Sequence, residues 1–459
     1  MKEITVRDII KICNGELIIG NLEEKCTNFS KDTRTIQQGD TYIGINGENF
    51  NGNLFYKNAL EAGAKICIIE DIQIDEQIKS KYKDRTIIKV KDTIKALQLL
   101  ATYKRSLYNI PVIAVTGSVG KTSTKDIIAS VVSKKYKVLK TKGNYNNNIG
   151  LPLTILELNN HKALVVEMGM NSLGEISVLT NIAKPTIALI TNVGTAHIGK
   201  LGSRQNILKA KLEILEGLKE NGTLVINNDN DLLNEWNKQN TKYNVIGVGI
   251  ENKSDINAIN IHEEEEKNTF TAIIGKEELN VTVPVIGNHF IYNAMCAIAV
   301  GKILEIEEEK ILQGIQEFEL TKDRMEIIKI KNNITIINDC YNANLDSMSA
   351  GIEALSKTKG NKKVAVLGDM LELGEYSEKL HKQVGAEVVR NNIDILITVG
   401  KEAKNIANIA KEKIEVYEFY ENEEAIKKLK EILNNGDVVL VKASNGMHFA
   451  EIIETLKKE

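Results

Sequence analysis

The chain has 459 residues, with 59 basic and 62 acidic side chains and a formal net charge of -3. This near balance provides no basic footprint for nucleic acid or for an anionic membrane surface, so small molecules are the expected partners. The five cysteines are odd in number, widely spaced and never arranged as C-x-x-C, which argues against a disulfide framework or a zinc site and fits a cytoplasmic protein. No apolar run is long enough to span a bilayer, and a chain of this length is expected to divide into about three domains.

Residues 1–108 alternate short strand and helix patterns and predict a small mixed α/β domain. The first residues alternate charge with short apolar runs, which predicts neither a signal peptide nor a membrane anchor. The polar cluster Asp32, Thr33 and Arg34 precedes a glycine turn and a short strand, so a pocket could form there. A solvated loop between strands is the simpler alternative, and periodicity does not decide between the two.

The stretch VIAVTGSVGKTSTK, near the start of the segment 109–318, carries the strongest local signal. Its β-branched apolar run predicts a buried parallel strand, Gly117 and Gly120 allow a tight turn, and the next residues begin a helix whose free N–H groups would face an anion. Lys121 would lie between β- and γ-phosphates, and the Thr122 hydroxyl would bind Mg²⁺. The strict pattern G-x-x-x-x-G-K-[ST] lacks its first glycine here. A purely structural turn is the alternative, but a Lys-Thr pair after a strand favours nucleotide phosphate binding.

Further strands are predicted in the same segment over 163–167, 186–191 and 223–226. Helical patterns lie between them, which favours right-handed βαβ crossovers and a mostly parallel sheet with ligands at the carboxyl ends of its strands. Glu167 ends one strand and His197 follows the next, so both are expected at the edge that carries Thr122. Alone, a strand-end Glu is often solvated and a loop His is often scaffold, but the three together favour a metal site.

Two motifs in this segment allow more than one interpretation. GNYNNNIGLPLT is dense in asparagine, for which compositional bias is the simple explanation. Asn also tolerates left-handed backbone and offers donors and acceptors beside the phosphate loop, which favours a polar substrate. SRQNILKAKLEILEGL predicts an amphipathic helix with Lys209 and Lys211 on different faces. Solvated lysines are the default, but near bound phosphates a lysine could supply charge or form a carbamate with CO₂ that binds Mg²⁺, and the sequence does not choose.

VPVIGNHFIYNAM is predicted to turn helical after its glycine, with Asn288, His289 and Asn293 near the helix start. N-capping explains one of the asparagines. The segment 319–459 again alternates strands, in ITIIND, KKVAVLGDM, DILITVG and DVVLVKAS, with helices, and predicts a second doubly wound α/β domain. Arg324 lies near its start, where an arginine at a domain junction is well placed to reach across a cleft to phosphates.

In this order the motifs resemble those of the bacterial Mur ligases, ATP-dependent amide-forming enzymes of peptidoglycan precursor synthesis, over nearly the whole chain. TGSVGKTSTK resembles their P-loop, GNYNNNIGLPLT their substrate loop, ITNVGTAHIG the loop of their metal-site histidine, and GNHFIYNA their adenine-side motif. DCYNANLDSMSAGIEAL and VLGDMLELG are most similar to the type that joins D-alanyl-D-alanine to UDP-N-acetylmuramoyl-tripeptide.

The resemblance implies a three-domain α/β fold. A small mixed domain over 1–108 would bind the UDP-sugar, a central P-loop ATPase-like domain over 109–318 with a mostly parallel sheet would bind ATP, and a C-terminal Rossmann-like domain over 319–459 would bring in the dipeptide. The implied cofactors are ATP and Mg²⁺, and the implied partners are UDP-N-acetylmuramoyl-tripeptide and D-alanyl-D-alanine. A monomer is expected, but the sequence does not determine the oligomeric state. The γ-phosphoryl of ATP would pass to the tripeptide carboxylate, and the dipeptide amine would attack the acyl phosphate.

The resemblance also implies roles for individual residues. The catalytic residues would be Lys121, His197 and Lys211, the last as the carbamylated lysine. The metal ligands would be Thr122, Glu167 and His197. The nucleotide would be bound by Gly117, Ser118, Val119, Gly120, Lys121, Thr122, Ser123, Asn288, Asn293, Arg324 and Asp339. The sugar-peptide substrate and the reaction centre would be contacted by Thr33, Arg34, Asn147, Asn148, Asn342, Asn344 and Ser347.

The chain departs from the family pattern at three places, where Asn51-Gly52-Asn53 replaces Asp-Gly-His, Leu345 replaces a proline and Asn445 replaces an arginine. The third residue of the stem peptide stays open. Three other functions remain: a Mur ligase that adds a different amino acid, a P-loop ATPase or switch that couples hydrolysis to motion, and a non-catalytic protein that kept the fold. Retention of the phosphate-loop lysine and of the acidic and histidine residues argues against the last.

Overall fold

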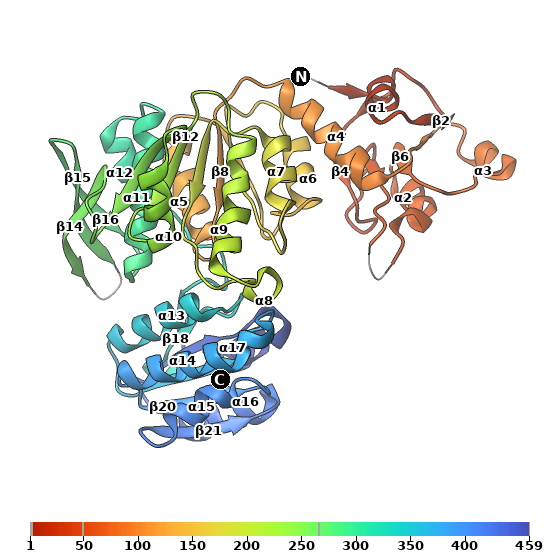
Figure 1. Cartoon of the computed structure of the whole chain (residues 1–459). Coiled ribbons are helices and arrows are strands. Elements are labelled where there is room, and N and C mark those ends of the chain that lie inside the picture. Colours follow the sequence, from red (N-terminus) through yellow and green to blue (C-terminus); the bar gives the residue numbers. More distant parts are fainter. Residues whose placement is uncertain (1–2, 48–49, 265–266, 459) are drawn as a thin grey trace.

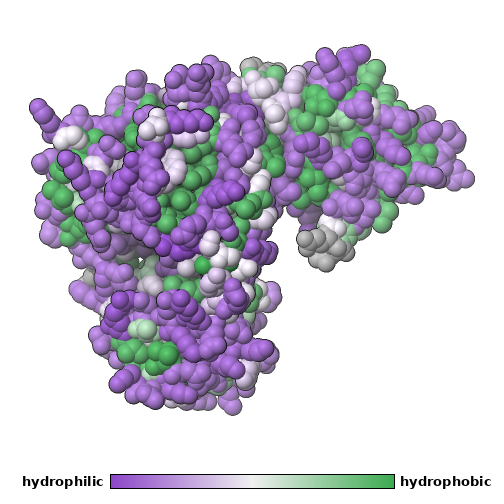
Figure 2. All heavy atoms as spheres, viewed as in Figure 1, coloured by the Kyte–Doolittle hydropathy of each residue, from purple (hydrophilic) through white to green (hydrophobic). Residues whose placement is uncertain are grey.

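The computed structural model describes residues 3–47, 50–264 and 267–458, which form three α/β regions around separate sheets (Figure 1). The N-terminal region, in red and orange, extends from one side of the central region, and the C-terminal region, in blue, lies against another side. Hydrophilic side chains cover most of the face shown in Figure 2. Among the described helices, none is long and apolar enough to cross a membrane. The predicted three-part α/β fold is confirmed.

The N-terminal region is a five-stranded sheet in the order β2-β7-β6-β5-β4, with the β2–β7 pair antiparallel and the other pairs parallel. Helix α4 packs against α6 and α7 of the central region, and Arg105 near its end donates a 2.7 Å hydrogen bond to the carbonyl of Ala183. The elements are β1 (Ile4–Thr5), α1 (Val6–Cys13), β2 (Glu16–Ile19), β3 (Lys25–Cys26), β4 (Phe29–Ser30), β5 (Thr41–Ile43), α2 (Tyr56–Ala62), β6 (Ile66–Ile69), α3 (Glu76–Lys81), β7 (Thr86–Lys89) and α4 (Thr93–Ser106).

The central region is built on a nine-stranded sheet in the order β16-β15-β14-β13-β12-β11-β8-β10-β9. Strands β8 to β14 pair in parallel and β15 and β16 are antiparallel additions, so the predicted mostly parallel sheet is confirmed. The strands are β8 (Val112–Thr116), β9 (Val138–Lys140), β10 (Ala163–Glu167), β11 (Ile187–Ile190), β12 (Thr223–Asn227), β13 (Asn244–Gly249), β14 (Ile256–Glu263), β15 (Asn268–Ile274) and β16 (Glu277–Val283). The helices are α5 (Lys121–Ser133), α6 (Gly150–Leu156), α7 (Glu175–Ala183), α8 (Ile198–Leu201), α9 (Arg204–Leu212), α10 (Asp231–Gln239), α11 (Asn288–Ile303) and α12 (Glu308–Gln316).

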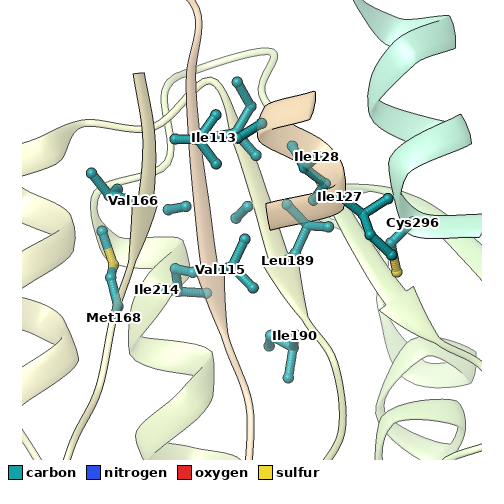
Figure 3. Close-up of a cluster of buried hydrophobic side chains, with 14 of the residues drawn as sticks. Ile113, Val115, Ile127, Ile128, Val166, Met168, Leu189, Ile190, Ile214 and Cys296 are labelled. Atoms are coloured by element: carbon teal, nitrogen blue, oxygen red, sulfur yellow. The ribbon is translucent and has the colours of Figure 1, made fainter. Parts of the chain in front are cut away.

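Strand β8 forms the middle of the central core, with β10 and β11 on either side. Figure 3 shows Val115 of β8 among side chains of the neighbouring strands and of helix α5, including Val166, Leu189 and Ile127, all of which are fully buried. Burying each such aliphatic side chain stabilises the fold by about 1.5–3 kcal/mol. This dense packing fixes the carboxyl end of β8, and the polar loop that follows it begins at a rigid point.

The C-terminal region is a six-stranded sheet in the order β17-β18-β22-β19-β20-β21, parallel except for the edge strand β17, and the predicted doubly wound arrangement is confirmed. The strands are β17 (Glu326–Lys329), β18 (Thr335–Asn338), β19 (Lys363–Gly368), β20 (Ile395–Val399), β21 (Glu415–Phe419) and β22 (Val438–Lys442). The helices are α13 (Leu345–Lys357), α14 (Ser377–Arg390), α15 (Lys404–Ala410), α16 (Asn422–Ile432) and α17 (Ala450–Lys457), and short 3₁₀ turns include η2 (Glu213–Glu216) and η4 (Gly374–Tyr376).

The C-terminal region approaches two glycines of the central region closely, with backbone atoms at Gly199 and with a side chain at Gly194. A Cβ atom on Gly194 would lie 2.2 Å from a carboxylate oxygen of Asp346, and one on Gly199 would lie 2.6 Å from the carbonyl oxygen of Glu372. At Gly199 a larger residue would push the regions apart because the neighbouring atoms are backbone, whereas at Gly194 the Asp346 side chain could turn away. The contact therefore closes a cleft between the two sheets' carboxyl edges.

Candidate active site

A cleft of about 450 Å³ lies between the central and C-terminal regions. It opens where β8, β10 and β11 end, as the parallel-sheet rule predicts. The predicted site residues that line it are Ser118, Val119, Gly120, Lys121, Thr122, Ser123, Asn147, Glu167, His197, Asn293, Arg324, Asp339, Asn342, Asn344 and Ser347. Both regions contribute, so the docked arrangement is needed to complete the cleft.

The loop after β8 turns at two glycines that no other residue could replace without strain. Gly117 has φ +155°, and a Cβ atom there would lie 1.8 Å from Oγ1 of Thr191. Gly120 has φ +78° and stands immediately before helix α5. The first N–H groups of a helix have no partner within the helix, so the first turn of α5 presents donors and the positive end of the helix dipole to the cleft.

Asn192 binds two backbone amides of the loop between β8 and α5. Its Oδ1 accepts hydrogen bonds from the amides of Ser118 and Val119, both at 3.0 Å. The amides of Ser118 and Val119 are therefore already engaged, and the backbone donors without this partner begin at Gly120. The loop is held in place by Asn192, which follows β11.

Lys121 folds back over the loop. Its Nζ donates to the carbonyl oxygens of Gly117 at 2.9 Å and Ser118 at 3.4 Å. Burial lowers the pKa of Lys121, the neighbouring Glu167 carboxylate raises it, and Arg324 lowers it further. A bound phosphate would supply the missing negative charge, and Nζ could exchange two carbonyl contacts for phosphate oxygens.

Thr122 and Glu167 meet at the ends of neighbouring elements and could hold a magnesium ion. The Thr122 hydroxyl donates to Oε2 of Glu167 at 2.9 Å, and Nδ2 of Asn146 donates to Oε1 of the same carboxylate at 2.8 Å. One hydroxyl and one carboxylate fit Mg²⁺, which prefers oxygen ligands and takes its others from waters and phosphates. The described residues contain no group of three or more His, Cys, Asp or Glu side chains suited to a metal, so such an ion would depend on the nucleotide.

His197 stands directly before helix α8 with φ +64°. Its Nδ1 lies 2.8 Å from Oε2 of Glu372, which comes from the C-terminal region. Burial lowers the pKa of His197, the Lys121 cation lowers it further, and Glu372 opposes both. A neutral imidazole with one nitrogen engaged by a carboxylate keeps a lone pair on the other, which is what a metal ligand requires.

Lys211 and Lys209 lie on different faces of α9, as predicted, and differ completely in environment. Lys211 is 1 % exposed, whereas Lys209 is exposed. Burial, reinforced by the Lys121 cation, lowers the pKa of Lys211 well below its usual value. A lowered pKa increases the fraction of neutral amine, which is the form that adds CO₂, so the environment is compatible with a carbamate. Lys211 lies behind the cleft wall rather than among its lining residues.

Two buried polar atoms at the cleft have no hydrogen-bond partner in the protein, namely Nδ2 of Asn293 and Nε of Arg324. Oδ1 of Asn293 accepts from the Thr124 hydroxyl at 2.8 Å, which turns the amide group so that Nδ2 stays available. The Arg324 guanidinium lies 3.8 Å above the Tyr341 ring and reaches Oγ1 of Thr122 at 3.4 Å. Because buried donors are normally satisfied, both atoms point to a polar ligand.

The site residues predicted from the C-terminal region have two kinds of contact. Asp339 belongs to an ion pair, and Asn344 and Ser347 cap a helix. Lys442, which is 1 % exposed, forms an ion pair with Asp339 and donates to the carbonyl of Asn342 at 3.1 Å. Asn344 caps α13 and exchanges hydrogen bonds with Ser347 in a capping box. Capping explains these last two positions without a substrate, although both also line the cleft.

Several predicted residues lie outside the cleft. Asn148 is exposed and its carbonyl accepts from Gln98, whereas Asn147 caps the backbone of Gly150 and does line the cleft. Asn288 is exposed in a neighbouring groove. The capping interpretation of that stretch is wrong, because glycine is the N-cap of α11 and no side chain caps it.

Thr33 and Arg34 lie in the N-terminal region, in the loop between β4 and β5 and apart from this cleft. Arg34 forms an ion pair with Asp32, and that hydrogen bond lowers the pKa of Asp32 to about 2. The geometry of the pair is that of a stabilised surface loop, and the interpretation of this loop as a pocket stays a prediction.

Four cleft residues or partners were not singled out from the sequence: Asn146, Asn192, Glu372 and Lys442. Asn146 lies in the asparagine-rich stretch, and the abundance of asparagine there could not identify which side-chain amide contacts Glu167. Asn192 directly follows a predicted strand and was accessible to the same strand-end argument as Glu167. Glu372 and Lys442 act from a different region of the chain, and their partners follow only from the docked fold.

A P-loop at the end of the central strand, an acidic residue at the end of the next strand and a second α/β region over the cleft define a P-loop α/β protein of three domains. Three family models match the chain: Mur ligase family, catalytic domain, over residues 26–105; Mur ligase middle domain over 115–301; and Mur ligase, glutamate ligase domain, over 323–445. The chain belongs to the Mur ligase family.

Within this family the similarity extends over full-length relatives. The chain is 39% identical over 459 residues to the UDP-N-acetylmuramoyl-tripeptide–D-alanyl-D-alanine ligase of Bacillus subtilis, covering 98% of each chain. It is 32% identical to the protein of the same name from Escherichia coli, covering 100% of this chain and 99% of that one. A crystal structure of MurF from Acinetobacter baumannii superposes with a TM-score of 0.91 at 28% identity over 100% of both chains. MurF ligase from Thermotoga maritima in complex with ADP gives 0.82 at 28% identity, over 94% of this chain and 97% of that one.

Proposed function

We propose that the chain is an ATP-dependent amide ligase that joins D-alanyl-D-alanine to the terminal carboxylate of UDP-N-acetylmuramoyl-tripeptide. The products are the UDP-pentapeptide, ADP and phosphate. One observation carries the proposal: a single cleft gathers the phosphate-loop Lys121, the Thr122–Glu167 pair and, from the other region, Arg324. The full-length similarity to ligases of that name supports the choice of substrates.

The chemistry begins with activation of the carboxylate. Oxide is a poor leaving group, so the γ-phosphoryl of ATP passes to a carboxylate oxygen and gives an acyl phosphate. The dipeptide amine then attacks the acyl carbon, and phosphate leaves with the electrons of the C–O bond while the amine loses a proton. Both organic reactants are anionic, so catalysis depends on neutralising and positioning charge rather than on a nucleophilic side chain.

The chain's own groups divide this work. The amides of the first turn of α5 and the Lys121 ammonium hold the β- and γ-phosphates, and Arg324 approaches them from the C-terminal region. The unsatisfied Nδ2 of Asn293 offers a hydrogen bond to the base or ribose. Lys442, at the end of β22, forms an ion pair with Asp339 and fixes that carboxylate at the cleft wall. The two regions together exclude water from the acyl phosphate.

Mg²⁺ would be held by Thr122 and Glu167, with His197 and a carbamylated Lys211 serving a second ion. When bound, such ions neutralise phosphate charge and act as Lewis acids on the transferring group. Asn146 fixes the orientation of the Glu167 carboxylate, and Glu372 engages the far nitrogen of His197. Glu167 and His197 thus each have a partner that sets the direction of the side chain.

The division of labour among the domains is part of the proposal. Residues 1–108 bind the UDP-sugar, 109–318 bind ATP, and 319–459 bring in the dipeptide. All five cysteines are free thiols, four of them buried, which fits a reducing cytoplasm. We expect a monomer in solution.

The test is phosphate release by the purified protein with ATP and either substrate alone or both together, combined with mass spectrometry of the nucleotide-linked product. The proposal requires release only with both, and the mass of the UDP-pentapeptide. Release without either substrate would indicate an uncoupled ATPase instead. Release with the UDP-tripeptide and a different amine would keep the ligase class and change the acceptor.

A further inference from the structure

The loop between β19 and η4 carries one side chain across the domain interface. Oε2 of Glu372, in this loop, lies 2.8 Å from Nδ1 of His197, which precedes α8 in the central region. The second carboxylate oxygen lies 3.9 Å from Nζ of Lys200, so the His197 contact is the closer one. The side-chain carboxylate of Glu372, which belongs to the C-terminal region, therefore reaches the ring of His197, and His197 lines the ATP cleft.

Buried side chains of the C-terminal region hold this loop in place through hydrogen bonds with two of its backbone amides. The amide of Met370 donates to Nε2 of His381 at 3.0 Å, and the amide of Leu371 donates to Oγ of Ser444 at 2.9 Å. His381 and Ser444 are 0 % and 3 % exposed. Since two consecutive amides are held by buried acceptors, the position of Glu372 is set by the C-terminal core.

Both partners have left-handed backbone at the contact. His197 and Glu372 each have φ +64°, a conformation that non-glycine residues adopt at a free-energy cost and that persists where the surroundings enforce it. Gly199 allows the approach, because a Cβ atom there would lie 2.6 Å from the Glu372 carbonyl oxygen. The contact between the two regions therefore depends on two residues with left-handed backbone, His197 and Glu372, and on the glycine at position 199.

An ionised carboxylate only accepts hydrogen bonds, so a neutral imidazole facing Glu372 must place its proton on Nδ1. The lone pair then resides on Nε2. We propose that Glu372 is a positioning residue: from the C-terminal region it holds His197 in the Nδ1–H tautomer, so that the ligating nitrogen is prepared only when the two regions dock. This inference rests on the proposed function of the cleft, but its geometry involves neither ATP nor metal.

The first test reads the tautomer directly, on full-length protein labelled with ¹⁵N-histidine. Long-range ¹H–¹⁵N correlation spectra at a pH where His197 is neutral should show Nδ1 protonated and Nε2 bare in the wild type. Glu372→Ala should shift the ring toward the Nε2–H form, and Glu372→Gln, whose amide can either accept from or donate to Nδ1, should weaken the preference for Nδ1–H less than alanine does. Glu375→Ala, an exposed acidic neighbour on the same loop, is the matched control. An unchanged His197 tautomer in Glu372→Ala would overturn the proposal.

The second test is a double-mutant cycle on ligase turnover. Losing a residue that orients a metal ligand typically reduces activity 10–100-fold, so we expect a kcat loss of that order for Glu372→Ala with little change in KM for the dipeptide. Glu372→Gln should lose less. In a His197→Ala background, Glu372→Ala should have no further effect, because the residue acts through the ring. Independent, multiplicative losses would show that Glu372 acts otherwise, for example as a plain domain latch.

The two tests separate this proposal from the proposed function. If the wild type formed no amide, the ligase assignment would fail while the tautomer spectra still decided the role of Glu372. If turnover is normal and the spectra of wild type and Glu372→Ala coincide, the ligase assignment stands and the positioning role falls.

Discussion

Lys121 is the residue on which we expect phosphate binding in the cleft to depend most. It is held over the loop by two carbonyl oxygens and lies beside the Glu167 carboxylate. For Lys121→Ala we expect kcat to fall about 10²–10³-fold, the loss found when one preorganised donor to developing charge is removed. Circular dichroism should show an intact fold. Lys209→Ala, at an exposed position, should leave turnover unchanged. Near-normal turnover of Lys121→Ala would overturn the P-loop assignment.

Lys211 and Lys209 form a matched pair on one helix. Lys211→Met should abolish most turnover while leaving thermal stability equal or higher, because the substitution removes a buried amine whose neutral form is forced by burial. Lys209→Met should change neither property. Turnover within twofold of the wild type for Lys211→Met would restrict Lys211 to a packing role and remove it from the metal site.

His381 gives the chain a predictable pH response. Burial lowers its pKa from the ordinary 6.5, and this effect is opposed by the hydrogen bond that Nδ1 donates to the Ser377 carbonyl oxygen and by the Asp369 and Glu402 carboxylates. Below pH 6.5 the unfolded state therefore binds more protons than the folded state, so stability present above pH 6.5 is lost as the pH falls. Denaturant unfolding should show wild type losing stability relative to His381→Gln between pH 7.5 and pH 5. Parallel curves for the two proteins would contradict this.

At the scale of elements, helix α5 is tied to the interdomain linker by a buried charge cluster. Asp126 is 3 % exposed and pairs with Lys125, itself 1 % exposed, at 3.2 Å and with Lys140 at 2.8 Å. Its other oxygen accepts from the Thr321 hydroxyl at 2.6 Å, three residues before Arg324. The same carboxylate therefore anchors the P-loop helix and the segment that delivers the cleft arginine.

Removing this carboxylate should leave Lys125 as an uncompensated buried cation. We expect Asp126→Ala to reduce the free energy of unfolding by about 3–5 kcal/mol. The double variant Lys125→Met/Asp126→Leu should regain most of that loss, since two apolar residues need no pairing. Equal destabilisation in the single and double variants, measured by denaturant titration, would show that packing rather than charge holds the cluster.

The sequence predicted best those elements whose pattern is contained in a few consecutive residues. The run ALVVE was predicted over 163–167 and forms β10 at those limits, because a strand buried on both faces must be apolar throughout. The P-loop and the end of β10 lie side by side, as strand-end reasoning required. Helix caps were less predictable: glycine rather than Asn288 caps α11, since the turn there needs φ +104°.

The contacts between regions could not be predicted in the same way. Nothing in VLGDMLELG says that Glu372 faces His197, because their distance in the fold depends on how two separately folded sheets dock. Lys442 is similar: a lysine at a strand end is ordinarily solvated, and its burial against Asp339 follows only from the packing of β18 beside β22. Sequence patterns predicted the residues of the phosphate loop, and the docked fold adds the contacts that Glu372 and Lys442 make with His197 and Asp339.

At the scale of the whole molecule, Gly199 controls how closely the regions approach. For Gly199→Ala, a methyl group 2.6 Å from the Glu372 carbonyl oxygen must hold the regions apart. We expect kcat to fall at least tenfold with smaller changes in ATP affinity, because the phosphate loop lies wholly in the central region. Gln205→Ala, exposed on the next helix, serves as the control. Turnover equal to that of the control would mean that docking is not required.

Docking should also be visible as a change of shape. Because the site residues come from two regions, binding of an ATP analogue together with the UDP-tripeptide should make the wild type more compact in small-angle scattering. Gly199→Ala should show a smaller change under the same conditions. Identical scattering of the wild type with and without both ligands would contradict a closing motion.

We propose that this cleft activates a carboxylate by phosphorylating it. The most direct test supplies UDP-N-acetylmuramoyl-tripeptide labelled with ¹⁸O in its terminal carboxylate, together with ATP and D-alanyl-D-alanine, and measures the mass of the phosphate released. An acyl phosphate predicts one ¹⁸O atom in each phosphate and one in the new amide. Unlabelled phosphate formed alongside the UDP-pentapeptide would contradict the mechanism.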